Sequence, residues 1–509
     1  MRQSTRLIAN TTAQYTRTVI NVVLSLYSTR LILLALGESD YGIFTLIGGV
    51  VSLLSFVTSA LVVTTQRFMS FYQSKNDYEY LKELFGNSLG LHAIISIVVL
   101  IAFEAIGPFL FNGFLNIDPQ RIDAAKIVYQ CAICMLIMAF MNSPFRALLI
   151  SHENLVYCSI VDVLNGVLKV GIATYLTYYG TDKLVNYAFL MICVTAIDGI
   201  LYILYDIKKY KECSVKYFFK LKKTIIKEMA SFIGWTIYST MCIIGRTQGT
   251  AVVLNKFFGT VLNAAFGIAL QVSGAIAFIS NSALSAISPQ IVKAEGAGNR
   301  KLMLQKSAFA SKISFLLLAI LVVPLCYYTP YILKIWLKEV PENAALFSRV
   351  IMITALVDQL TIGLGTANRA IGHIRNYSIV VNTIKVLTVP VIIILLLCNV
   401  PINQTIWVYV LIEFICAMVR IPYLKRTAGL NVSEYCKSVF FRILRPILLI
   451  LALYTVTWMF MPVNLGLIIV YGIVITIFYI LSIYWWGLDS MEKNLASQLL
   501  GTIKSKLKH

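Results

Sequence analysis

Apolar stretches alternate with short polar segments along nearly the whole chain of 509 residues. A helix needs about 20 predominantly apolar residues to cross the hydrocarbon core of a bilayer. Fourteen stretches have roughly this length, at 11–36, 42–63, 87–111, 124–141, 158–178, 184–205, 230–255, 259–284, 308–328, 345–367, 377–397, 403–420, 443–461 and 465–486. The pattern predicts an all-α polytopic membrane protein with about fourteen transmembrane helices.

The distribution of charge gives this membrane protein an orientation. The chain is 59% hydrophobic and carries a formal net charge of +20. Thirty of its 43 Lys and Arg residues fall on the side of the amino terminus, seven fall on the opposite side and six lie within spans. Because cytoplasmic loops carry an excess of Lys and Arg, we expect both termini to be cytoplasmic. The positive charge then reflects topology, and no nucleic-acid partner is expected.

The densest basic segment holds eight lysines between Lys208 and Lys227. We interpret it as a topology anchor that lies on anionic lipid headgroups. The first apolar run has the length of a full span and no convincing small-residue cleavage site. We therefore expect it to remain as the first helix and not to be removed as a signal peptide.

Motifs for metal, cofactor or catalytic chemistry are weak in this sequence. Ten cysteines occur, nearly all of them within apolar runs, and the Cys131-x-x-Cys134 pair has no further Cys or His ligands nearby. The four histidines are scattered, and no phosphate-binding loop of the G-x-x-x-x-G-K-[ST] type is present. We expect no metal, no cofactor and no enzymatic activity.

A repeat relates the two halves of the chain. Matching dipeptides, tripeptides and single residues recur at an offset of 223–225 residues: Gly42-Ile43 with Gly267-Ile268, Ser59-Ala60-Leu61 with Ser282-Ala283-Leu284, and Gln66 with Gln290. An even number of helices per repeat predicts two parallel six-helix bundles around a central cavity. The expected domains are a first bundle at 1–206, a basic cytoplasmic linker at 207–229, a second bundle at 230–424, two additional helices at 425–486 and a cytoplasmic amphipathic tail at 487–509.

Two arginines lie within apolar spans that begin the two repeats. An arginine at bilayer depth costs about 2.5–3.5 kcal/mol on the insertion scale, so it needs a partner or a wet cavity. At helical spacing, Arg17 shares a polar stripe with Gln14 and Asn21, and Arg246 shares one with Ser239 and Thr250. We expect both arginines to face the cavity, as cations without a carboxylate in their own helix. Arg30 points away from the stripe and lies near a helix end, where snorkelling accounts for it equally well.

Other charged residues within or beside the spans are candidates for the same site. Asp162, Asn165 and Lys169 share one helix face, either as a ligand site or as a self-neutralising polar stripe. Lys385 with Asn382, and Asp358 with Thr361 and Arg369, form similar groups. The substrate-binding candidates are Arg17, Arg30, Lys169, Arg246 and Lys385. The candidates for coupling to Na⁺ or H⁺ are Asp162, Asp198, Asp358 and Glu413, each of which can instead neutralise a cation, as Glu413 can with Arg420.

A site rich in Arg and Lys is suited to an anion. Guanidinium groups make bidentate contacts with phosphate, and this pairing offsets the cost of burying both charges. The expected cargo is therefore a phosphate or pyrophosphate.

The segments "YTRTVINVVLSLYSTRLILLALGESDYGIF", "TTQRFMSFYQ", "GWTIYSTMCIIGRTQGTAVVLNKFFGT" and "SAISPQIVKAEGAGN" resemble the polysaccharide-repeat-unit (O-antigen or capsule) flippases. These belong to the superfamily that also contains the multidrug MATE exporters and the lipid II flippase. The resemblance implies a MATE-like fold in the bacterial inner membrane. It also implies export of an undecaprenyl-pyrophosphate-linked oligosaccharide, with other polysaccharide assembly proteins as partners. In this family a cationic lumen receives the pyrophosphate, which Arg17 and Arg246 match in position and charge, with Lys169 and Lys385 as looser matches.

Three other classes of protein need to be weighed against this resemblance. A multidrug exporter of the same fold is expected to carry acidic residues in its first and seventh helices, whereas those helices carry arginines here. A membrane glycosyltransferase or polymerase needs a substantial external loop, and the longest expected external connection, 329–344, is short. A lipid II flippase shares the pyrophosphate chemistry and is the main alternative.

Overall fold

The computed structural model describes residues 3–52, 54–75, 77–111, 117–178, 182–337, 340–372, 374–460, 465–489 and 492–493. Within these residues the secondary structure is helical, and no strand occurs. Ten helices are long and apolar enough to cross a membrane, and a bent helix pair forms an eleventh span if it is counted as one. The prediction of an all-α polytopic membrane protein is confirmed.

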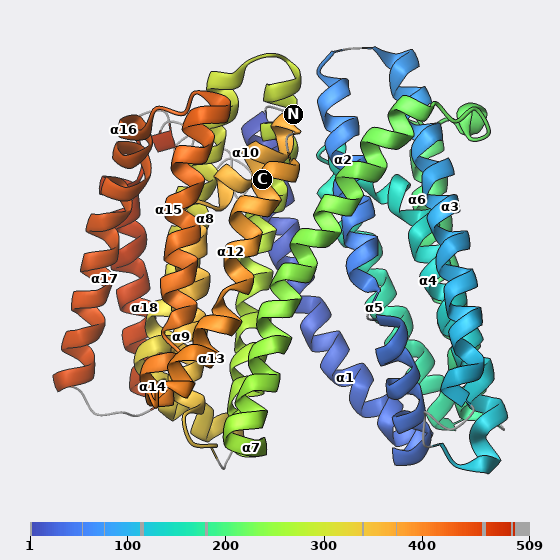
Figure 1. Cartoon of the computed structure of the whole chain (residues 1–509), viewed down its shortest axis with the longest axis horizontal. Coiled ribbons are helices and arrows are strands. Elements are labelled where there is room, and N and C mark those ends of the chain that lie inside the picture. Colours follow the sequence, from blue (N-terminus) through green and yellow to red (C-terminus); the bar gives the residue numbers. More distant parts are fainter. Residues whose placement is uncertain are drawn as a thin grey trace, which may run out of the picture. The chain divides into compact units, whose positions relative to one another are not determined.

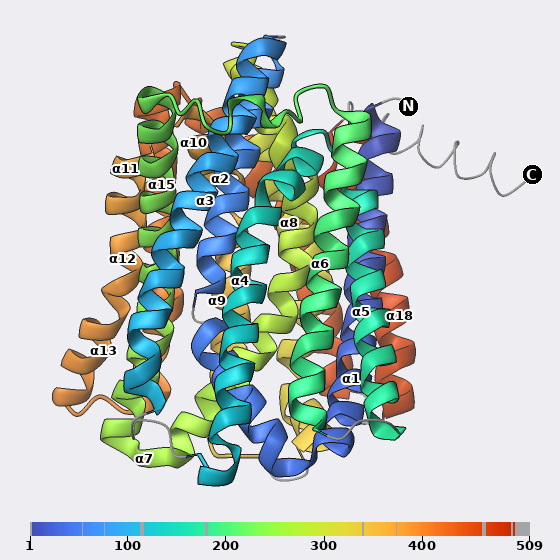
Figure 2. The same cartoon turned by 90° about the vertical axis from the view of Figure 1, so that its right-hand side faces the viewer.

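The three other predicted spans lie in helices that turn or break. The helix α1 (Gln3–Ser52) contains the first span and the start of the second, and the chain turns at Gly37, whose φ of 77° lies in the left-handed region that glycine tolerates. The second span continues in α2 (Ser55–Gln73). The seventh and eighth spans both fall in α7 (Lys223–Gly296), whose 74 residues would extend about 110 Å as one straight rod. Its ribbon bends at the lower end in Figure 2.

The chain forms two compact units, each of which is an antiparallel helical bundle (Figure 1). The N-terminal unit comprises Ile8–Ile237. The C-terminal unit comprises the described residues from Tyr238 onward together with residues 3–7. The division falls within α7.

The N-terminal unit is organised around one central helix. Its further helices are α3 (Tyr78–Phe109), α4 (Ile122–Ser151), α5 (Leu155–Tyr178) and α6 (Lys183–Lys209), with short 3₁₀ turns η2 (Pro119–Arg121) and η3 (Val215–Tyr217). The central helix α4 packs against α2, α3, α5 and α6. The side chains of Asp77 and Asp182 accept hydrogen bonds from backbone N–H groups in the first turns of α3 and α6, so acidic caps define both helix starts.

The C-terminal unit has a broken helix at the level of its polar site. Its helices include α8 (Arg300–Leu337), α9 (Ala344–Gln359), α10 (Ile362–Ile371), α11 (Ile374–Tyr377), the π-turn η4 (Ser378–Asn382), α12 (Thr383–Val386), α13 (Thr388–Leu397), α14 (Ile402–Thr405) and α15 (Val408–Ala428). The axes of α9 and α10 differ by 48°. A Cβ at Gly363 would lie 2.0 Å from the carbonyl oxygen of Ser307, so only glycine lets α10 approach α8 this closely.

The chain continues in the C-terminal unit with the two additional helices. This part contains α16 (Val432–Tyr435), the π-turn η5 (Cys436–Phe440), α17 (Phe441–Phe460), α18 (Leu465–Ser482) and the π-turn η6 (Ile483–Gly487). Both α17 and α18 pack on α8. The Nζ of buried Lys312 in α8 lies 2.6 Å from a carboxylate oxygen of Glu492, so this ion pair joins the segment after η6 to α8. The predicted amphipathic tail lies outside the described residues from position 494 onward.

Candidate functional site

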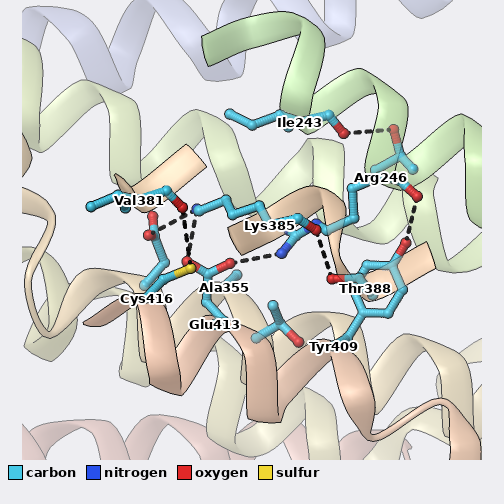
Figure 3. Close-up of polar contacts among 12 residues, drawn as sticks. Ile243, Arg246, Ala355, Val381, Lys385, Thr388, Tyr409, Glu413 and Cys416 are labelled. Carbon is cyan, nitrogen blue, oxygen red and sulfur yellow. Dashed lines mark hydrogen bonds and ion pairs between the residues drawn. The ribbon is translucent and has the colours of Figure 1, made fainter. Parts of the chain in front are cut away.

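Five ionisable side chains meet inside the C-terminal unit. This C-terminal charge cluster comprises Arg246 of α7, Asp358 of α9, Lys385 of α12, and Glu413 and Arg420 of α15. The two carboxylate oxygens of Glu413 lie 2.8 Å from Nη1 of Arg246 and 2.7 Å from Nζ of Lys385. Figure 3 shows Glu413 between these two cations. An oxygen of Asp358 lies 2.8 Å from Nη2 of Arg420 and 3.4 Å from Nζ of Lys385.

The cluster is buried and carries a surplus of positive charge. The side chain of Glu413 is 1% exposed, that of Arg420 6% and that of Lys385 8%. With every group ionised, three cations face two carboxylates. Buried charges require partners, because leaving one uncompensated costs several kcal/mol. The two carboxylates therefore hold the three cations in place and leave a surplus of one positive charge among these five residues.

The structure gives Arg246 a carboxylate partner, which its own apolar span at 230–255 lacks. Arg246 is paired with Glu413, a residue 167 positions away in the chain. Its guanidinium also lies over the ring of Tyr409, 5.0 Å from the centroid, and the Tyr409 hydroxyl is hydrogen-bonded to Thr250 at 2.9 Å. Within the described part of the chain, Nε of Arg246 has no acceptor. The Nε–H is thus available to an acceptor, while Nη1 is bound to Glu413.

The sequence offered Arg420 as a partner of Glu413, one heptad away, and the structure has this ion pair at long range, with Nη2 of Arg420 3.9 Å from an oxygen of Glu413. The nearer partner of Arg420 is Asp358, at 2.8 Å. The break between α9 and α10 explains this arrangement, because it exposes polar backbone at the end of α9. Arg420 donates to the carbonyl of Asp358 at 3.4 Å and to the hydroxyl of Thr361 at 3.1 Å. Broken helices commonly form binding sites in transporters.

The N-terminal unit contains a similar but more exposed group. The N-terminal charge cluster comprises Arg17 of α1, Arg146 of α4, Asp162 and Lys169 of α5, and Asp198 of α6. The same oxygen of Asp162 lies 2.5 Å from Nη1 of Arg17 and 2.9 Å from Nη2 of Arg146. The side chains of Arg17 and Asp162 are each 20% exposed. Here too, three cations accompany two carboxylates.

Two members of this cluster, Asp198 and Lys169, do not share in the ion pairs of Asp162, and Arg30 lies apart from the cluster. The amide of Asn165 donates to the carboxylate of Asp198. Lys169 is half-buried and forms no ion pair within 4 Å among the described residues. Arg30 is exposed and likewise has no ion pair in the described part of the chain, so the structure does not bring it into the cluster.

The sequence interpretation missed Arg146 as a site residue and gave Arg420 only a structural role. A signal for Arg146 was present, because the pair Arg146-Ala147 recurs as Arg369-Ala370 at an offset of 223, within the range of the repeat.

The sequence interpretation also missed the buried carboxylate Asp206. It is completely buried, and neither carboxylate oxygen has a hydrogen-bond partner in the described residues. The pattern of polar residues along α6 did not single out Asp206, because it lies just before the lysines that end this helix.

The loops beside α4 and α6 contain a titratable pair outside the predicted spans. The ring of His152 stacks on Tyr210, with centroids 4.0 Å apart, and its Nε2 lies 2.7 Å from a carboxylate oxygen of Glu212. Burial acts to raise the pKa of Glu212, but the hydrogen bond and charge of His152 outweigh it and hold this pKa below its ordinary value. Glu212 therefore favours the folded state when it is ionised.

We expect acid to remove this contribution to stability. A carboxyl whose pKa is depressed by folding stabilises the protein above its unfolded-state pKa, about 4.3 for Glu, and loses that effect as the pH falls through the folded-state pKa. The thermal midpoint of Glu212→Gln should therefore fall less steeply than that of the parent protein between about pH 5 and pH 3. Exposed Glu434→Gln is the matched control. Identical pH profiles for the parent and Glu212→Gln would contradict the assignment.

Within the described residues, no group of three His, Cys, Asp or Glu side chains is arranged to hold a metal ion. The cysteines of the Cys131-x-x-Cys134 pair are both free, one buried and one exposed.

Solved transporter structures share the fold of this chain. No protein-family model and no curated protein matches it. A MATE structure in the bent conformation superposes with a TM-score of 0.72 at 14% identity, covering 86% of this chain and 99% of the other. An outward-facing multidrug resistance MATE transporter of the MOP superfamily gives 0.70 at 13% identity, with 86% and 97% covered. A MOP superfamily transporter from Pyrococcus furiosus, described by a reversed polarity of its binding pocket, gives 0.69 at 12% identity, with 85% and 96% covered.

These likenesses and the apolar helices define the class of the molecule. It is a multi-pass membrane protein with the MATE fold, as the sequence predicted. Its structural neighbours are MATE transporters of the MOP superfamily. At identities of 12–15%, the likeness establishes the fold and leaves the cargo to the chemistry of the site.

Proposed function

We propose that this protein is a flippase that moves an undecaprenyl-pyrophosphate-linked oligosaccharide repeat unit from the cytoplasmic to the periplasmic leaflet of a bacterial inner membrane by alternating access. The observation that carries the proposal is the cationic surplus of a charge cluster in each unit. Arg246 and Lys385 in one cluster, and Arg17, Arg146 and Lys169 in the other, are the groups that would bind the pyrophosphate.

The chemistry of the clusters favours an anionic headgroup over other cargo. Phosphate oxygens accept two parallel hydrogen bonds from one guanidinium, which gives both affinity and orientation. Arg246 and Arg420 each have a buried Nε without an acceptor among the described residues. Each unmet donor costs about 1–3 kcal/mol when it is buried, which an incoming phosphate oxygen would recover.

The alternative functions differ from the proposed one in the lipid that is carried or in the sign of the charge on the cargo. A lipid II flippase would use the same pyrophosphate contacts and remains the second candidate. A multidrug or cation antiporter needs a carboxylate that is open to a cation, whereas Asp162, Asp358 and Glu413 are each paired with at least two basic residues. The printed description of the Pyrococcus furiosus neighbour, that reversed pocket polarity suggests a different function, supports the use of pocket charge as a guide to cargo in this fold.

The energy source follows from the charge of the proposed cargo. An inside-negative potential favours outward movement of an anion by about 2.3 kcal/mol per charge per 100 mV. A doubly charged headgroup is therefore driven outward by voltage alone. Coupling to Na⁺ or H⁺ through Asp162, Asp198, Asp358 or Glu413 is the alternative, and the ion pairs of three of these carboxylates weigh against it.

The test is to remove the protein and identify the lipid that accumulates. We expect an undecaprenyl-pyrophosphate-linked repeat unit to build up in the cytoplasmic leaflet and to decline when the intact gene is restored. Proteoliposomes with purified protein should expose the same lipid to an added glycosidase. Accumulation of lipid II would favour the second candidate, and an unchanged lipid profile with altered export of a cationic drug would overturn the proposal.

A further inference from the structure

The basic segment between the two repeats is bound to the N-terminal unit along a defined surface. We call residues 210–223 the strap. A Cβ at Gly86 of α3 would lie 2.7 Å from Cβ of Tyr217, and a Cβ at Gly90 would lie 2.4 Å from a side-chain carbon of Leu221. These two glycines, one helical turn apart, let the strap lie almost against the backbone of α3. The strap is therefore a docked element and not a loose tether.

Polar contacts also fix the position of the strap along α3. The backbone N–H of Lys222 donates to the side-chain oxygen of Asn87 at 2.6 Å. The Nζ of Lys222 lies 2.6 Å from the carboxylate of Glu83, and the hydroxyl of Tyr217 donates to Glu79 at 3.4 Å. Successive turns of α3 thus bind both the backbone and the side chains of the strap.

The outward side of the strap combines an apolar tip with an excess of positive charge. Phe219 is 89% exposed, the highest value among the exposed large hydrophobic residues of the described chain. The lysines that flank it along the chain are all exposed: Lys208, Lys209, Lys211, Lys216, Lys220, Lys222, Lys223 and Lys227. Of the nearby carboxylates, Asp206 and Glu212 are buried, while Glu79 and Glu228 are exposed, so the lysines outnumber the carboxylates at this surface. An exposed apolar side chain flanked by lysines is the pattern of an interfacial membrane contact.

The position of the strap along α3 places this surface at the boundary of the bilayer. The 32 residues of α3 extend about 48 Å, longer than the hydrocarbon core of roughly 30 Å. Its apolar run begins at residue 87, between the two glycines that receive the strap. The docked segment therefore lies where the polar end of α3 meets the apolar run, at the level expected for headgroups.

We propose that the strap is a lipid-binding anchor, with anionic phospholipid headgroups on Lys216, Lys220 and Lys223 and Phe219 inserted into the interface between them. Each lysine near an anionic surface contributes about 1 kcal/mol, and an aromatic side chain adds apolar contact. Lys222 is excluded from the lipid-facing set because Glu83 neutralises it. The proposal concerns the surface of the N-terminal unit and does not depend on which cargo the protein carries.

The test measures stabilisation of the detergent-purified, full-length protein by added phospholipid. Phosphatidylglycerol should raise the thermal midpoint of the parent protein, and phosphatidylcholine should have little effect. The triple variant Lys216→Ala, Lys220→Ala, Lys223→Ala should need about 100-fold more phosphatidylglycerol for half of the effect, the ratio that ~3 kcal/mol represents for three lysines. Soluble glycerol phosphate at equal concentration should not substitute for the lipid.

The matched control removes the same charge elsewhere, at exposed Lys301, Lys425 and Lys437. We expect this control to change the phosphatidylglycerol concentration that gives half of the rise in thermal midpoint by less than threefold. Equal shifts for both triple variants would overturn the proposal, since general electrostatics would then suffice. A second measurement follows Phe219→Trp in nanodiscs with brominated phospholipid, where the added emission should be quenched. Emission that is not quenched would contradict insertion of the tip.

Discussion

Glu413→Gln is expected to lower the yield of folded protein sharply, by destabilising the C-terminal unit by about 3–5 kcal/mol. The replacement keeps the size of the side chain but removes the charge that neutralises both Arg246 and Lys385. The C-terminal charge cluster would then hold three buried cations and one carboxylate. The measurements are the folded, monodisperse fraction after solubilisation and the thermal midpoint.

Exposed Glu434→Gln in the same unit is the control and should leave both quantities unchanged. Adding Arg246→Met to Glu413→Gln should recover part of the lost stability, because it removes one of the uncompensated cations. If Glu413→Gln were as stable as the parent protein, Glu413 would not be the counter-ion that holds the cluster together.

Arg246→Ala is expected to leave the protein folded but to lower export roughly 10- to 100-fold, the effect of losing ~1.5–3 kcal/mol from one charge-assisted hydrogen bond to cargo. After this change the cluster contains two cations and two carboxylates, and Glu413 still has Lys385 as a partner. Charge balance is therefore preserved, while the surplus positive charge that would bind a pyrophosphate is lost.

Arg246→Lys should be intermediate, because lysine retains the charge but not the planar fork that binds two phosphate oxygens. Arg17→Ala should behave in the same way as Arg246→Ala, since Asp162 retains Arg146 at 2.9 Å. Exposed Arg30→Ala, on the same helix as Arg17, is the control and should export normally. The measurement is lipid-linked glycan reaching the outer leaflet per folded molecule. Normal export by well-folded Arg246→Ala would refute the role in binding, and loss of folded protein in proportion to export would indicate a structural brace instead.

The elements found from the sequence are those that depend on local pattern. Apolar runs of bilayer length identify transmembrane helices because the membrane imposes one length on all of them. The first span was predicted to end at residue 36, and the chain turns at Gly37, where only a residue without a side chain adopts the backbone angle at little cost. The merger of two predicted spans within α7 was not foreseen, because apolar length does not reveal how one helix is joined to the next.

The sequence by itself determined the polytopic class, the cationic character of the first and seventh spans and the repeat that relates them. Periodicity could do this because a polar stripe on one helix is a local property. Only the tertiary structure decided the partners: Asp162 for Arg17 across 145 residues and Glu413 for Arg246 across 167. Such pairs depend on which helix faces pack together, and the spacing of residues within one helix contains no information about the residue that faces it. The net charge of each cluster, and therefore its suitability for an anion, was decided at that level.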